Sequence, residues 1–155
     1  MLKQVQHDSE QVWLLYFYHL CSLVKTVFKV GDTKQFTRTV RPEDTAAFES
    51  GEVHPVYATF ALTRDAEWSS RLFVLEMKEA HEEGIGTFVN VKHVSPAFVG
   101  HEVLFEAVID ELKGNEVNCS FTAKVNGRLI AEGRTGQKIL PKEKIERLFE
   151  GLKND

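Results

Sequence analysis

The sequence of 155 residues is poor in cysteine and proline and has no excess of positive charge. Its two cysteines, Cys21 and Cys119, form neither a metal-binding pair nor a disulfide framework, which favours a reducing, cytoplasmic location. No run rich in glycine, serine or proline divides the chain. The net charge of -4 makes a nucleic acid or an acidic membrane surface an unsuitable main partner.

Several motifs of catalysis are also missing. No spacing of histidines, cysteines or carboxylates is typical of a metal site, and there is no GxSxG motif for a nucleophilic serine. The sequence GIGT at 84–87 lacks the length and the following helix of a dinucleotide-binding fingerprint. We therefore expect neither a metal nor an organic cofactor.

The most apolar stretch is VWLLYFYHLCSLV at residues 12–24. It is shorter than the roughly 20 residues that a membrane-spanning helix needs, and no signal-peptide charge precedes it. It is interpreted as a helix packed on the domain or on a partner, as translated sequence upstream of a natural start near Val24 or Val27, or as a membrane-associating segment. We treat residues 1–26 as an atypical extension and residues 27–155 as one domain of ordinary globular composition.

The first half of this domain contains the longest expected helix. Alternating residues at 34–40 predict a strand, and residues 41–51 predict a short helical turn. From about Thr59 to His81 there is no proline or glycine, and apolar residues recur at helical spacing. Gly84 is the expected C-terminal stop of this helix.

After this helix the hydrophobic period changes to two, which predicts antiparallel strands. The expected strands are 86–94, 101–112, 116–125 and 128–140. Asn126–Gly127 is a strong hairpin signal, and a short amphipathic helix is expected after Pro141. About four strands in a meander expose one apolar face, and the long helix has one apolar stripe, so each must cover the other. This predicts an α+β hotdog fold, in which a curved antiparallel sheet wraps around a central helix.

Three polar residues do not fit a purely structural pattern. Glu67 interrupts the apolar part of the helix, and His93 shares strand parity with Val89 and Val91. Each has an ordinary explanation: a solvent-facing Glu67, a satisfied buried His93, and an N-cap for Thr59. Taken together, they supply a carboxylate, an imidazole and a hydroxyl near one helix–sheet seam, a set that can activate water or a nucleophile at an acyl carbon.

The spacing of these residues constrains how they can act. Thr59 and Glu67 are eight residues apart, which is roughly 12 Å along one straight helix. Either the chain before about Thr63 is not helical, or a second subunit supplies one of the residues. The second alternative makes a homodimer part of the active site.

Two stretches resemble the fluoroacetyl-CoA thioesterase-like branch of the hotdog superfamily: VYATFALTRDAEW at 56–68 and GIGTFVNVKHVSPAFVG at 84–100. The shared pattern is a Thr, a Glu-Trp eight residues on, a Gly-Thr, and a His that follows the Glu by 26 residues. The resemblance covers about residues 28–153. It implies that the matching Thr59, Glu67 and His93 form the catalytic set.

The resemblance also implies a role for Gly86, whose backbone N–H would lie by the substrate carbonyl and help to hold the oxyanion. The sequence departs from the fluoroacetate-specific member at its aromatic lid residue, where Val53 and Tyr57 are found instead. It departs again in the final strand, where RTGQK replaces a His and an Arg. We therefore expect a general thioesterase for short or medium acyl-CoA.

The expected protein is thus a cytoplasmic homodimer that hydrolyses acyl-CoA, with no nucleic acid or membrane as partner. An alternative is a non-catalytic acyl-CoA binding or sensing protein that has the same pocket. A hotdog hydratase is a weaker alternative, because it would need an Asp/His dyad at the start of the helix, where this sequence has no histidine.

Overall fold

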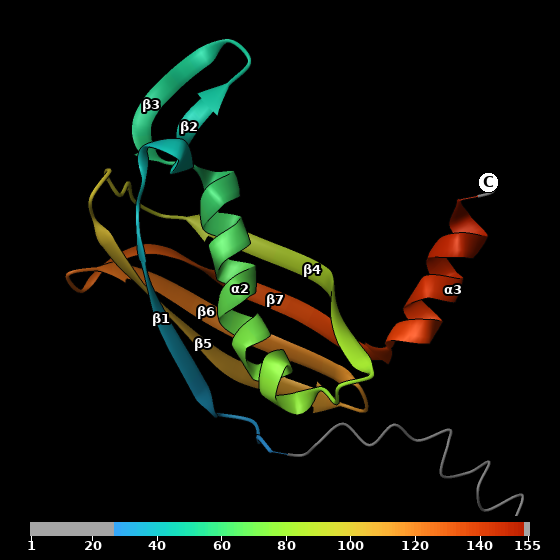
Figure 1. Cartoon of the computed structure of the whole chain (residues 1–155). Coiled ribbons are helices and arrows are strands. Elements are labelled where there is room, and N and C mark those ends of the chain that lie inside the picture. The colour runs from blue at the N-terminus through green and yellow to red at the C-terminus, as the bar shows by residue number, and fades with distance from the viewer. Residues whose placement is uncertain (1–26, 154–155) are drawn as a thin grey trace, which may run out of the picture.

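One long helix, α2, crosses the face of a five-stranded antiparallel sheet (Figure 1). The computed structural model describes residues 27–153. Its elements in chain order are β1 (Thr33–Thr39), the 3-10 helix η1 (Pro42–Asp44), β2 (Thr45–Phe48), β3 (Gly51–Tyr57), α2 (Thr59–Met77), β4 (Glu82–His93), β5 (Glu102–Lys113), β6 (Glu116–Val125), β7 (Arg128–Pro141) and α3 (Lys142–Leu152). Since residues 1–26 lie outside this range, the structure does not choose between the interpretations of the apolar stretch.

The sheet has the strand order β1-β5-β6-β7-β4. Strands β5, β6 and β7 form a meander, and the β6–β7 turn has positive φ at Asn126 and Gly127, as a tight hairpin requires. The expectation that all four late strands form one meander is wrong, because β4 pairs with β7 rather than with β5. Periodicity identifies the residues that form strands, but it does not identify their neighbours.

The core lies between α2 and the sheet. The buried face of α2 includes Leu62, Ala66 and Phe73 at helical spacing. In β6 the burial alternates strictly, and the residues on the buried face are Val117, Cys119, Phe121, Ala123 and Val125. Each large apolar side chain buried in this way stabilises the fold by about 1.5–3 kcal/mol, so the helix and the sheet hold one another in place.

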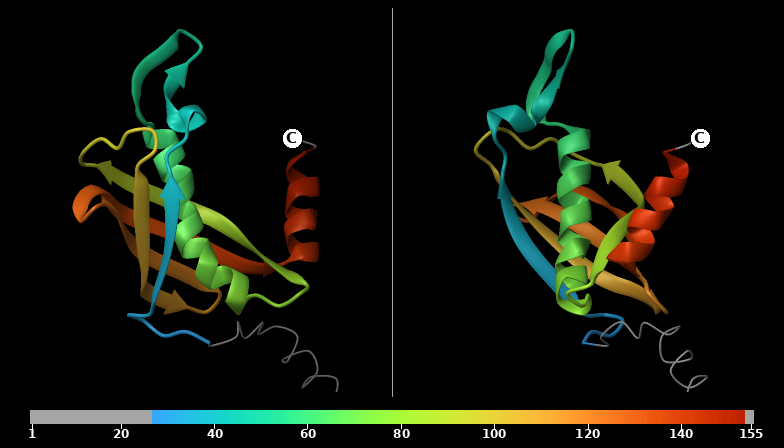
Figure 2. Two further views of the ribbon diagram at one scale, coloured as in Figure 1. Left: turned by 60° about the vertical axis from the view of Figure 1, so that its left-hand side comes forward. Right: turned by 45° about the vertical axis from the view of Figure 1, so that its right-hand side comes forward.

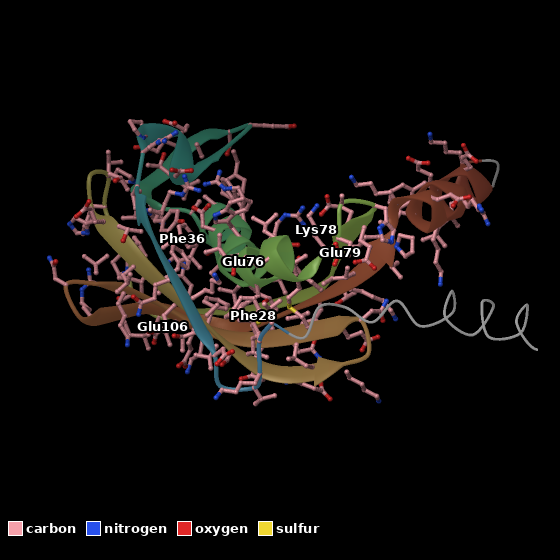
Figure 3. All side chains as sticks on the ribbon, turned by 60° about the horizontal axis from the view of Figure 1, so that its bottom comes forward. Phe28, Phe36, Glu76, Lys78, Glu79 and Glu106 are labelled. Atoms are coloured by element: carbon pink, nitrogen blue, oxygen red, sulfur yellow. The ribbon has the colours of Figure 1, made fainter. Side chains whose placement is uncertain are left out.

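Aromatic contacts tie the N-terminal part of the described chain to both layers. The Phe28 ring meets the Phe73 ring of α2 edge to face, with centroids 5.1 Å apart, and Phe36 of β1 stacks on Phe105 of β5 at 5.0 Å. In Figure 3, Phe28 and Phe36 are labelled among the side chains that pack against the core. Strand β1 is therefore a firmly packed edge of the sheet.

The long helix begins at Thr59 as expected, but it ends at Met77 rather than near His81. Gly84 is not its stop, since this residue lies within β4. A Cβ on residue 84 would overlap the side chain of Val74 in α2. The glycine is therefore needed where β4 passes close to the helix.

The segment 41–51 is also different from its prediction. Only Pro42–Asp44 is helical, and the rest enters a β2–β3 hairpin whose turn includes Gly51 with φ of 104°. This hairpin projects beyond the N-terminal end of α2 (Figures 1 and 2). At the opposite edge of the molecule, α3 stands away from the sheet in both figures. No helix within residues 27–153 is long and apolar enough to cross a membrane.

Candidate active site

Thr59 and His93 form a direct side-chain pair. Thr59 is the first residue of α2, and its Oγ1 lies 3.0 Å from Nδ1 of His93, the last residue of β4. Thr59 does not serve as the N-cap, because Ala58 holds that position. The other ring nitrogen of His93, Nε2, is buried and has no hydrogen-bond partner among the described residues. The imidazole therefore has one nitrogen engaged by a hydroxyl and one available for further chemistry.

Glu67 lies two helical turns after Thr59 and is partly buried against β4. A Cβ added to Gly86 would overlap Oε1 of the Glu67 carboxylate, with Cδ at 3.3 Å. Only a residue without a side chain lets the carboxylate approach this strand so closely. The residue of β4 that faces the Glu67 carboxylate is therefore a glycine, Gly86.

The helical turn that carries Glu67 is also fastened to β7. Gln137, which lies opposite Gly86 in the β4–β7 ladder, is almost completely buried. Its Nε2 donates to Ser70 Oγ at 3.1 Å and more weakly to the Glu67 carbonyl at 3.4 Å. Ser70 Oγ in turn donates to the same carbonyl at 2.9 Å. These bonds limit the movement of the Glu67 backbone relative to the sheet.

The structure brings the four candidate residues together as two separate pairs. Because α2 is helical from Thr59 onward, Thr59 and Glu67 lie about 12 Å apart along its axis. Gly86 and His93 are seven residues apart on β4, a rise of roughly 20 Å. The alternative in which the chain before Thr63 is not helical is therefore wrong. One subunit contains a Thr59–His93 pair and a Glu67–Gly86 pair that do not share a reacting group.

A shallow hollow of about 260 Å³ opens beside Glu67. Its lining residues are Arg38, Arg64, Asp65, Glu67, Trp68 and Arg71. Among them, Asp65 is fully buried on the core face of α2. The carboxylate-bearing residue Glu67 of the candidate set is therefore among the residues that line this hollow.

Asp65 is the centre of a hydrogen-bond network that sequence reasoning missed. Both of its carboxylate oxygens accept bonds from Arg38, at 3.0 and 3.1 Å, and from Arg64, at 3.0 Å each, and one also accepts from the Tyr57 hydroxyl. Arg64 extends the network to Asp44 at 2.9 Å. The signal was present in the sequence, because Asp65 has helical spacing from buried apolar residues, where a carboxylate needs partners.

The protonation of this network follows from its contacts. Burial acts to raise the pKa of Asp65, but hydrogen bonds from Arg64 and Tyr57 and the charge of Arg38 outweigh it, so that pKa is lowered. Burial, followed by the bond to Asp65, raises the pKa of Tyr57. Asp65 therefore stays ionised and Tyr57 stays protonated, which suits a fixed structural lock and not a proton donor to substrate. Within residues 27–153 there is no group of three or more His, Cys, Asp or Glu side chains placed to hold a metal ion.

Comparisons with known proteins agree with this architecture. Residues 40–143 match the model of the family described as fluoroacetyl-CoA-specific thioesterase. A hypothetical protein of Thermus thermophilus, a thioesterase superfamily member, is 40% identical, with a TM-score of 0.79 over 83% of this chain and 96% of that one. No curated protein sequence matches the chain.

Two more distant solved structures share the fold. The fluoroacetyl-CoA thioesterase FlK is 20% identical, with a TM-score of 0.74 over 80% of this chain and 96% of that one. A hot-dog-like protein from Thermanaerovibrio acidaminovorans is 21% identical, with a TM-score of 0.71 over 79% and 92% of the two chains. The expected α+β hotdog fold is thereby confirmed.

Proposed function

Because the chain belongs to the fluoroacetyl-CoA-specific thioesterase family and is a thioester hydrolase, we propose that it hydrolyses short or medium acyl-CoA thioesters at a site shared by two subunits. The observation that carries this proposal is the 3.0 Å contact between Thr59 and His93, with Glu67 and Gly86 held as a second pair on the same two elements. A further support is that one similar solved structure is a mutant of FlK in complex with acetyl-CoA.

The free edge of the sheet supports a shared site. Within the described residues β4 pairs only with β7, so its other side has unpaired backbone groups along twelve residues. Phe88 is exposed on this strand, and no proline protects it. Antiparallel pairing of β4 with its copy about a two-fold axis sets the first half of one strand against the second half of the other. Gly86 of one subunit then approaches His93 of the partner.

The chemistry of such a site assigns a role to each residue. Glu67 acts at the thioester carbonyl, either as the base that takes a proton from water or as a carboxylate nucleophile whose anhydride is then hydrolysed. The Gly86 N–H stabilises the developing oxyanion. Thr59 hydrogen-bonds the reacting group, and His93 orients it and returns a proton to the departing CoA thiolate. Both routes yield a carboxylic acid and free CoA thiol.

The two positions that replace the aromatic lid argue against specificity for a fluorinated acyl group. Tyr57 is buried, and its hydroxyl donates to Asp65, so it does not face a substrate. Val53 lies on the projecting hairpin and is not aromatic. We infer that the acyl preference is broader than fluoroacetyl.

The first test is thiol release from acetyl- through decanoyl-CoA and fluoroacetyl-CoA, with wild type beside Glu67→Gln. We expect release by the wild type and a decrease in kcat of at least about 100-fold in the variant. Near-normal turnover by Glu67→Gln would refute its assigned role. Binding of the esters without turnover by the wild type would instead indicate a sensing protein.

Mixed dimers test the shared site directly. Glu67→Gln and His93→Ala chains, each inactive alone, are refolded together. In a shared site, each mixed dimer has one site with intact Glu67 and His93, so the mixture should recover about a quarter of wild-type activity. If each subunit contained a complete site of its own, every site in the mixture would lack one residue and no activity would return.

A further inference from the structure

Helix α3 has an apolar face that the rest of the described chain does not cover. None of its eleven residues is buried, and Leu148, Phe149 and Leu152 are 54%, 50% and 62% exposed. An isolated helix of this length is marginal in water, and most helices are held by packing of their apolar face. The helix therefore needs a surface to pack on.

The base of α3 is fixed at the beginning of β4. The Lys142 N–H donates to the His81 carbonyl at 2.9 Å, and its Nζ donates to the Ala80 carbonyl at 2.9 Å. From this base the helix rises beyond β4, on the same side of the sheet as α2 (Figures 1 and 3). It therefore flanks the free edge of the sheet.

A second uncovered apolar surface surrounds the other end of β4. Phe60 follows Thr59 and is 52% exposed, and its ring meets the ring of Phe48, which is 62% exposed, at 6.0 Å. We name this the Phe60 surface. Phe48 and Phe60 make up this surface, and Val94, which directly follows His93, is also exposed. The surface therefore lies next to the Thr59–His93 pair.

The pairing of β4 with its copy relates these two surfaces. The start of β4, where α3 rises, meets the end of the partner's β4, where the Phe60 surface lies. Resting on the shared site of the proposed function, we propose that the apolar face of α3 packs on the Phe60 surface of the partner subunit, beside the partner's Thr59–His93 pair.

The charges of α3 favour this occupant over a lipid surface. Residues 142–152 contain three basic and three acidic side chains, so the helix has no net charge. Helices that bind anionic membranes are rich in Lys and Arg on their polar face. A second copy of the chain provides an apolar surface of matching kind at the place where the strand pairing leaves α3.

Cross-linking between differently tagged chains tests the proposal. One chain carries Phe149→Cys and the other Phe60→Cys, both with Cys21→Ser, and the remaining Cys119 is buried. A short bismaleimide should then join the two chains covalently. The matched control is Arg147→Cys, on the polar face of the same helix, which should give far less product.

A second measurement does not depend on the geometry of a reagent. Phe149→Ser removes an exposed side chain in the isolated subunit, so the fold should be unaffected. Because each dimer contains two copies of the contact, the dimer dissociation constant should rise by about 100-fold or more, measured by sedimentation, whereas Arg147→Ser should change it little.

The outcomes separate this inference from the function on which it rests. Equal products from Phe149→Cys and Arg147→Cys, or an unchanged dissociation constant for Phe149→Ser, would overturn the α3 contact while mixed-dimer activity could still be recovered. A protein that is monomeric and fully active would overturn both proposals.

Discussion

The contact between Glu67 and Gly86 can be probed by adding a single methyl group. Gly86→Ala places a Cβ where the Glu67 Oε1 atom now lies, so the carboxylate has to move. Gly86 does not adopt a positive φ, so alanine fits its backbone conformation. The backbone N–H, which is the proposed oxyanion donor, is retained. The substitution therefore perturbs the position of the acid and little else.

The expected loss follows from the size of this displacement. The carboxylate must withdraw by about 1 Å, and misplacement of a catalytic group on this scale costs about 100-fold in rate. The free energy of unfolding should rise slightly or stay unchanged, because alanine in an allowed conformation reduces the conformational entropy of the unfolded chain. We thus expect kcat for Gly86→Ala to fall by about 100-fold, with an unfolding midpoint close to that of the wild type.

The assay is thiol release, with circular dichroism melting as the control for folding. A double-mutant cycle separates the acid from other causes: in a Glu67→Ala background the methyl group meets no carboxylate, so Gly86→Ala should cost little further activity. If kcat of Gly86→Ala is within twofold of the wild-type value, the position of the Glu67 carboxylate is not important for the reaction. An equal loss in both backgrounds would mean that the methyl group blocks substrate instead.

Two further predictions concern stability. Asp65→Asn should lower the free energy of unfolding by about 3 kcal/mol in urea titrations, because it leaves two arginines without their buried anion, whereas Glu76→Gln, at an exposed ion pair, should be close to wild type. The Gly84 N–H, more than the nearby cations, lowers the pKa of Glu83 from 4.5 to about 2. The contribution of the ionised Glu83 carboxylate to the free energy of unfolding is therefore complete above pH 4.5 and is lost as the pH falls toward 2. Glu83→Gln should flatten the pH dependence of stability in that window, and an unchanged slope would refute this role.

The sequence predicted most elements because burial imposes clear periods on them. The alternation in residues 116–125 and the helical spacing after Thr59 both depend on one buried face, and both are found in the structure. Gly84 was misinterpreted because a glycine after a helical pattern is usually a C-terminal stop. Its actual role is to admit the Val74 side chain. This contact joins residues ten apart through the tertiary fold, and no local pattern reports it.

The candidate site could be predicted as a set of residue types but not as an arrangement. Strand parity indicated that His93 faces inward, and the structure places it beside Thr59. Gly86, the residue of β4 that the Glu67 carboxylate contacts, could be identified only from the resemblance to the thioesterase family. Asp65 was missed although its place on the buried face of the helix required partners. Its three partners come from β1, β3 and α2 itself, so only the assembled fold brings them together.

The Thr59–His93 and Glu67–Gly86 pairs both depend on β4, the edge strand of the sheet. The same twelve residues place Gly84 against the core helix, Gly86 against Glu67, and His93 against Thr59. Because β4 contacts α2 near both of its ends, bending of the strand cannot bring its two pairs together without breaking these contacts. Two-fold pairing along this edge sets the first half of the strand beside the second half of its copy without moving any of these contacts. Phe88 is exposed on this strand and no proline interrupts it, so the edge can accept the pairing that the proposed shared site requires.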